Sequence, residues 1–193
     1  MAIKLRPHTS FIGTLHVQAS NGWVVPHGLS ATYIDNAPTS LDSGWVYADS
    51  GDSYSGWKPI AFGIDQAAGR LVGLPFWFGS YFNDDDHTYS FDLQVYDARK
   101  HVNPFQGYCL NVSRNGYVGV YSKGDERGPL WGVGDIDPSY LAEGHERKDL
   151  TLTSPEGRKV RRLMEERFPY LNDISGDDCK FTLRVEKVGV PRP

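Results

Sequence analysis

The sequence predicts a mainly β protein, an antiparallel β-sandwich or barrel with one amphipathic helix near the C-terminus. Runs of alternating polar and apolar residues recur along the chain, and turn residues separate them at short intervals. Aromatic residues are concentrated early, with 21 of 25 at or before Trp131. All acidic residues up to Asp125 are aspartates. Aspartate favours turns, whereas glutamate favours helices.

Length and charge narrow the class of protein. A chain of 193 residues can bury a sizeable core, and we expect a single β-rich domain over residues 1–193. The net charge of −4 argues against general nucleic-acid binding. No apolar run approaches the roughly 20 residues that a membrane-spanning helix needs. The first residues lack the apolar core of a signal peptide, so cytoplasmic localisation is the default expectation.

Several segments show strand periodicity. Phe11–Gln18, Thr88–Tyr96 and a final strand expected near residues 180–188 place apolar side chains at every second position. This is the pattern of a strand with one face in the core. Asp149–Thr153 is a shorter example. Leu71–Phe82 is more continuously apolar and is interrupted by glycine and proline, which predicts one or two covered strands with bends.

The strongest hairpin signal is Asn115-Gly116, because both central residues of a type I′ turn need positive φ. It would join Tyr108–Ser113 to Tyr117–Ser122. With the Pro-Leu-Trp sequence that follows at 129–131, this hairpin resembles one repeat of a β-trefoil. A β-trefoil-like fold is therefore the alternative to a sandwich or barrel.

Residues 155–168 are expected to form the helix. Ser154 suits the N-cap position and Pro155 the first helical position. Pro169 would end the helix. The apolar residues follow at i, i+3, i+4 and i+8, on one helical face: Val160, Leu163, Met164 and Phe168.

The sequence contains no motif for nucleotide binding, for a serine-hydrolase nucleophile or for a zinc protease, which favours binding over catalysis. Cys109 and Cys179 lie in expected strands and belong to no CxxC pair. We interpret them as reduced, buried thiols, with a disulfide as the alternative.

Residues 45–57 predict a carbohydrate site, because two tryptophans flank a segment rich in Asp, Ser and Gly. Sugar hydroxyls need polar partners, and the C–H faces of sugars lie against aromatic rings. Tryptophan and tyrosine would stack on the ligand, and carboxylate and amide groups would bind its hydroxyls. The expected ligand-binding residues are Trp45, Asp49, Asp52, Tyr54, Trp57, Asn83 and Asp85.

The densest polar cluster is Asn83-Asp84-Asp85-Asp86-His87. Three adjacent carboxylates repel one another, so we interpret this cluster as an exposed turn. Ca²⁺ held by Asp84 and Asp86 is the alternative, because Ca²⁺ binds oxygen ligands. No other cofactor or metal is expected.

The leading hypothesis is a non-catalytic, lectin-like binding module that recognises carbohydrate. The first alternative is a structural or protein-interaction protein, such as an inhibitor, an immunity-type protein or a particle-coat subunit. The second is a small hydrolase that uses paired carboxylates. The expected partners are a carbohydrate or protein ligand, with a homo-oligomer as a further option.

Overall fold

A computed structural model describes residues 3–19, 21–22, 24–25, 28–34, 44–48, 69–98, 103–122, 127–165 and 168–193. These residues form two antiparallel sheets and two short 3-10 helices, η1 (Pro7–Thr9) and η2 (Pro138–Tyr140). They contain no α-helix. The prediction of a mainly β, antiparallel protein is confirmed, and the prediction of a C-terminal helix is wrong.

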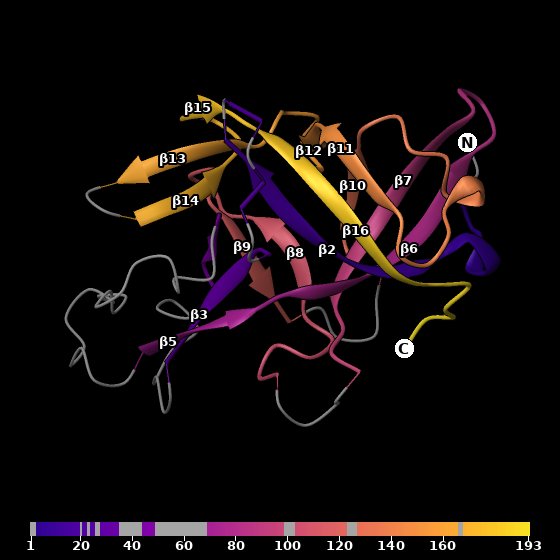
Figure 1. The fold of residues 1–193 in the computed structure, drawn as a ribbon, viewed down its shortest axis with the longest axis horizontal. Helices are drawn as coiled ribbons and strands as arrows, with labels where there is room; N and C mark the ends of the chain where they lie inside the picture. Colours follow the sequence, from indigo (N-terminus) through magenta and orange to yellow (C-terminus); the bar gives the residue numbers. More distant parts are fainter. Residues whose placement is uncertain are drawn as a thin grey trace.

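The larger sheet has ten strands among the described residues. They are β1 (Ile3–Leu5), β2 (Phe11–Gln18), β6 (Pro75–Asn83), β7 (Thr88–Val95), β8 (Cys109–Val112), β9 (Val118–Tyr121), β10 (Leu130–Val133), β11 (Glu146–Leu150), β12 (Leu152–Thr153) and β16 (Lys180–Val188). The main path runs β11-β16-β2-β6-β7-β10-β12, with β1 beside β6 and the β8–β9 hairpin beside β7. The sheet curls into a half-barrel (Figure 1).

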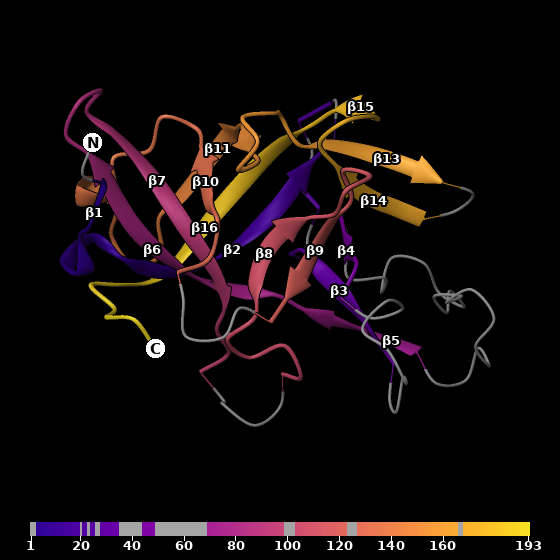
Figure 2. The same ribbon diagram turned by 180° about the vertical axis from the view of Figure 1, so that it is seen from behind.

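The smaller sheet has six strands in the part of the chain that is described, in the order β15-β13-β14-β4-β3-β5. They are β3 (Ser30–Ile34), β4 (Val46–Tyr47), β5 (Gly69–Gly73), β13 (Arg161–Glu165), β14 (Phe168–Asn172) and β15 (Asp177–Asp178). Figure 2 shows β8 and β9 between β7 and β4. Isolated bridges from Trp45 to Gly119 and from Tyr117 to Asn172 connect this hairpin to the smaller sheet.

The inside of the half-barrel holds the hydrophobic core. The rings of Phe11 and Phe78 stack with centroids 4.5 Å apart, and Phe91 meets Phe11 edge-on at 5.9 Å. The Trp131 side chain is fully buried, and its indole Nε1 donates a hydrogen bond to the Leu110 carbonyl at 3.0 Å. Phe11, Phe78 and Phe91 come from the neighbouring strands β2, β6 and β7, and Trp131 comes from β10 beside β7.

The polar face of β7 differs from the expected solvent-facing surface. Asp92 and Gln94 are as buried as their apolar neighbours. The Asp92 carboxylate accepts hydrogen bonds from Gln94 Nε2 at 2.6 Å and from the Gly128 backbone N–H at 3.1 Å. The chain around Gly128 therefore covers this face, and periodicity along β7 does not reveal a cover from so distant a segment.

The hairpin predicted at Asn115-Gly116 is confirmed, because β8 and β9 pair from Cys109–Tyr121 to Val112–Val118. The turn differs from type I′. Gly116 has φ +82°, but Asn115 is not among the described residues with positive φ. The Gly116 N–H donates to the Ser113 carbonyl at 2.9 Å. The loop is thus a three-residue connection whose last residue is a left-handed glycine, another common hairpin closure.

The segment expected to be helical, residues 155–168, instead contains the later residues of a β-turn that begins at Ser154, then β13 and the first residue of β14. The Gly157 N–H donates to the Ser154 carbonyl at 2.9 Å, and the Ser154 N–H donates to the Arg158 carbonyl at 2.8 Å. Serine at the first position, proline at the second and glycine at the fourth are also the preferences of a type I β-turn. The Ser-Pro-Glu signal thus fits two structures, and Gly157, at φ +76°, marks the turn.

Antiparallel pairing then replaces the helical hydrogen bonds. Residues of β13 pair with β14 from Arg161–Asn172 to Glu165–Phe168. The apolar stripe expected on one helical face is divided, since Val160 is 2% exposed and Met164 is 43% exposed. Pairing with a neighbouring strand and burial of Val160 stabilise this segment more than a single helix could on its own.

A Gly157→Ala variant distinguishes the turn from the helix by the sign of its effect. In a helix interior, alanine would stabilise the protein by about 1 kcal/mol relative to glycine. At φ +76° with no atom within 4 Å of the added Cβ, alanine meets only backbone strain. We expect Gly157→Ala to lower the free energy of unfolding by about 1 kcal/mol in urea denaturation.

The matched control is Gly73→Ala. Gly73 also has open space around an added Cβ, but its φ is not positive. Alanine there is expected to leave stability unchanged or to raise it by up to about 1 kcal/mol. Stabilisation by Gly157→Ala would contradict the turn.

Candidate functional site

The carbohydrate site predicted at residues 45–57 lies almost entirely outside the described residues. Trp45 is described: its side chain is half-buried, and its ring meets Tyr117 edge-on with centroids 5.5 Å apart. The other expected residues of this segment have no described structure: Asp49, Asp52, Tyr54 and Trp57.

Trp45 belongs to an aromatic cluster between the two sheets. Tyr117 meets Tyr170 edge-on at 5.5 Å, and Tyr170 lies 4.8 Å from Tyr47, between ring centroids. The Tyr117 hydroxyl donates a hydrogen bond to the Glu165 carboxylate, and burial together with this bond raises the pKa of Tyr117 to about 12. Packing between the sheets thus accounts for these rings.

The Asp-rich cluster is the exposed turn between β6 and β7. Asp84 forms an ion pair with Lys4 at 2.9 Å, and the hydrogen bond in this pair holds the pKa of Asp84 below its usual value. The Asn83 side-chain oxygen accepts the Asp85 N–H at 3.2 Å, and Asp86 accepts both the N–H and the hydroxyl of Thr88. Bonds within the hairpin engage the Asn83 and Asp86 side chains, and an ion pair with β1 engages Asp84.

Neither the Ca²⁺ site at this turn nor the carboxylate-dependent hydrolase gains support. In the part of the chain that is described, no group of three or more His, Cys, Asp or Glu residues is placed to hold a metal ion, at Asp84 and Asp86 or elsewhere. The three carboxylates are exposed on a hairpin turn, whereas a hydrolase would need a facing pair in a cleft. Cys109 and Cys179 are free thiols, so the disulfide alternative is wrong.

A different site lies where the two end strands of the larger sheet follow one another in the chain. The two ends of the larger sheet, β11 and β12, are consecutive in the chain and separated by Thr151 alone. The first part of this segment pairs with β16 and the second with β10, so the segment changes partner along its length. A pocket of about 720 Å³ lies beside this change of partner, lined by β11, β12, the start of β16 and the chain from β10 to η2.

A β-bulge shapes the β11 wall of the pocket. Arg147 pairs with Leu183 and Leu150 pairs with Phe181, so the register shifts by one residue between them. Asp149 takes up the shift with φ +59°, one of two positive-φ residues other than glycine in the described chain. Gln18, which is 6% exposed, accepts the Asp149 N–H at 2.7 Å and donates to its carboxylate at 3.3 Å.

The register of β11 against β16 determines on which side of the sheet each β11 side chain lies. Opposite residues of an antiparallel pair lie on the same side of a sheet. Arg147 is therefore on the side of Leu183, which is fully buried in the core. Bulges commonly redirect side chains beside functional sites, and backbone strain is often retained there.

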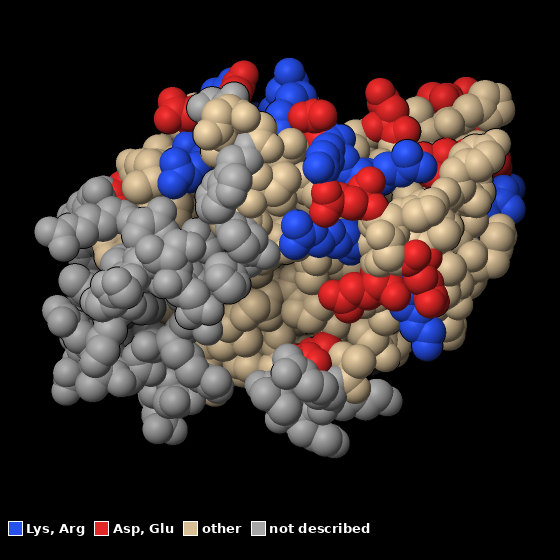
Figure 3. Space-filling model, viewed as in Figure 1, with Lys and Arg blue, Asp and Glu red and all other residues tan. Residues whose placement is uncertain are grey.

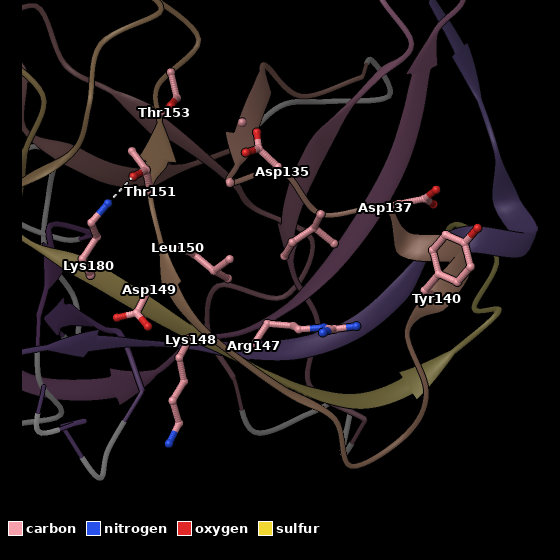
Figure 4. Close-up of a pocket in the computed structure, with 13 residues that line it drawn as sticks. Asp135, Asp137, Tyr140, Arg147, Lys148, Asp149, Leu150, Thr151, Thr153 and Lys180 are labelled. Carbon is pink, nitrogen blue, oxygen red and sulfur yellow. Dashed lines mark hydrogen bonds between the residues drawn. The ribbon is translucent and has the colours of Figure 1, made fainter.

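The opposite end of the pocket is formed by η2. Asp137 caps this helix by accepting the Ser139 N–H at 2.9 Å. The short helix leaves the Tyr140 side chain 74% exposed at the pocket. Figure 4 shows Asp137 and Tyr140 at one end, Asp149 and Lys180 at the other, and Arg147 extending toward the Tyr140 end.

Charges of both signs line the pocket. Lys180 Nζ donates to the Thr151 hydroxyl at 2.9 Å, and Lys148 pairs with Glu146 at 3.2 Å. Asp135 and Arg147 have no hydrogen bond or ion pair through their side chains to any described residue. Figure 3 shows basic and acidic side chains interspersed over the face that carries β11 and β16. The pocket therefore suits a polar ligand with several hydrogen-bonding groups.

Of the residues predicted from sequence to bind a ligand, the three that the structure describes, Trp45, Asn83 and Asp85, do not line this pocket. The Gly-Val-Gly-Asp-Ile-Asp-Pro run at 132–138 was a usable signal, since it combines turn residues with two carboxylates. The bulge at Asp149 has no such signal, because the segment reads as a regular strand.

The chain matches no protein-family model, no curated protein and no solved structure. The described residues contain no helix with the length and apolar character needed to cross a membrane. The fold and the pocket are therefore the basis for the function proposed below.

Proposed function

We propose that this chain is a non-catalytic carbohydrate-binding protein and that its ligand occupies the pocket between η2 and β11. The observation that carries the proposal is the exposed Tyr140 ring beside polar groups that have no partner in the described chain, at Asp135 and Arg147. An aromatic face suits the C–H groups of a sugar, and the polar groups suit its hydroxyls.

The size and construction of the pocket also support a bound small molecule. Its volume of about 720 Å³ lies within the usual range for ligand sites. Asp149 holds a strained backbone conformation at the pocket, and the buried Gln18 bonds to it twice. Such strain persists where the surroundings enforce it, and it is often found at binding sites.

A glycan array followed by calorimetry on the best-bound sugar tests the proposal. We expect Tyr140→Ala to weaken binding about tenfold, because removing one ring contact of roughly 1.4 kcal/mol has this effect on Kd. Tyr121→Ala is the matched control: Tyr121 is also exposed, at 36%, but it does not line the pocket. Its affinity should equal that of the unmodified protein.

The remaining outcomes separate the two sites. Absence of binding across the array would contradict the proposed function. Binding that survives Tyr140→Ala but is lost in Trp57→Ala would place the sugar at the segment 45–57 and would contradict the pocket.

A further inference from the structure

The group in the pocket that indicates the chemical class of the ligand is the Arg147 guanidinium. Arg147 lies on the same side of β11 as its pairing partner Leu183, which is fully buried, and Arg147 itself is exposed. In Figure 4 its side chain runs along the pocket toward Tyr140. No described residue forms an ion pair or a side-chain hydrogen bond with it.

The two acidic residues of β11 that flank Arg147, Glu146 and Asp149, have other partners. Glu146, its neighbour in sequence, accepts a hydrogen bond from Arg184 Nε at 2.8 Å and pairs with Lys148 at 3.2 Å. These two bonds, with that from Arg184 the larger influence, hold the pKa of Glu146 below its usual value. Asp149 is held by Gln18 on the bulge. The guanidinium thus forms no ion pair with a carboxylate of the described chain.

A second positive group lies in the same pocket. The Lys180 ammonium donates to a neutral hydroxyl, that of Thr151, and it forms no ion pair with a described carboxylate. Asp135 and Asp137 lie on the η2 side, where carboxylates would accept hydrogen bonds from sugar hydroxyls. The pocket thus offers donors to an anionic group at Arg147 and Lys180, and acceptors to hydroxyls at Asp135 and Asp137.

We infer that the ligand is an acidic sugar whose oxyanion binds the Arg147 guanidinium and whose hydroxyls face Asp135. This inference rests on the proposed function and adds the chemical class of the sugar. The planar guanidinium forms two parallel hydrogen bonds with a carboxylate or sulfate, which gives both affinity and orientation. A carboxylate and a sulfate share this chemistry.

Calorimetry with matched sugars tests the inference. The probes are glucose, glucuronic acid, glucose 6-sulfate and glucosamine, with galactose and galacturonic acid as a second pair. We expect an acidic sugar to bind about tenfold more tightly than its neutral partner, and this preference should weaken as salt is added. A preference for the uronic acids identifies a carboxylate ligand, and a preference for the sulfated sugar identifies a sulfate ligand.

Arg147→Gln should remove the preference, so that the acidic sugar and its neutral partner bind this variant with equal affinity. Lys148→Gln is the control, because it removes a neighbouring charge that already pairs with Glu146. Equal melting temperatures for both variants and the parent protein show that each is folded.

Two results would overturn the inference. One is equal affinity for acidic and neutral sugars in the parent protein, and the other is an acidic preference that persists in Arg147→Gln. If neutral sugars bind in a Tyr140-dependent way without an acidic preference, the proposed function stands and this inference fails. If no sugar binds, both fail.

Discussion

Replacing Trp131 with alanine is expected to lower the free energy of unfolding by about 3–5 kcal/mol, the usual effect of truncating a buried tryptophan. The Trp131 side chain is fully buried, and in the β10–β7 pair it lies opposite Phe91, which is also fully buried. Alanine would leave a cavity and would also leave the Leu110 carbonyl without its indole donor. Urea denaturation followed by far-UV circular dichroism measures the change.

Trp131→Phe separates the contribution of the buried apolar volume from that of the indole hydrogen bond. Phenylalanine retains most of the apolar volume but lacks the N–H group, so the expected loss is about 1–2 kcal/mol. Tyr140→Ala, at a side chain that is 74% exposed, should change stability by less than about 0.5 kcal/mol. A loss below about 1 kcal/mol in Trp131→Ala would show that the half-barrel interior is not the main core.

Asp173→Ala is the second substitution with a large expected effect. It should lower the free energy of unfolding by about 2–3 kcal/mol. The carboxylate is fully buried and accepts hydrogen bonds from the Ser154 hydroxyl at 2.7 Å and from Arg158 Nε at 3.1 Å. Alanine would leave the buried Ser154 hydroxyl unpaired, whereas the half-exposed Arg158 would recover hydrogen bonds to water. Equilibrium denaturation at neutral pH measures this loss.

Asp178→Ala is the matched control, because Asp178 also forms an ion pair with an arginine. Its partner is Arg161 at 3.2 Å, but the Asp178 side chain is 81% exposed. An exposed pair contributes little, so the expected loss is less than about 1 kcal/mol. Equal losses in Asp173→Ala and Asp178→Ala would contradict the buried network that joins the 154–158 turn to the end of β14.

The local pattern of the sequence predicts those parts of the fold that depend on neighbouring residues. Alternation predicts β2 over Phe11–Gln18 with the bounds that the structure shows, and it predicts a final strand over the residues of β16. The same reasoning fails at residues 154–168. Ser154 and Pro155 suit either an N-cap or a β-turn, and the choice depends on Asp173 and on β14, which lie later in the chain.

The predicted ligand-binding residues show the same difference between what local sequence predicts and what distant segments decide. Composition indicates aromatic and carboxylate-rich loops, but of those residues Trp45 packs between the sheets, and Asn83 and Asp85 belong to an exposed hairpin turn. The pocket instead combines residues of the β10–η2 segment with Arg147 and Lys180. These positions come together because β11 and β12 change partner at Thr151.

The sequence alone determined the mainly β character of this protein and the positions of several strands, because a two-residue period and local turn residues encode them. Tertiary structure alone decided three things: the β-turn in place of the helix, the burial of the polar face of β7, and the pocket. Each depends on hydrogen bonds and packing between distant segments, such as Gly128 with Asp92 and Gln18 with Asp149. The residue pattern along one strand does not predict which distant segment covers that strand.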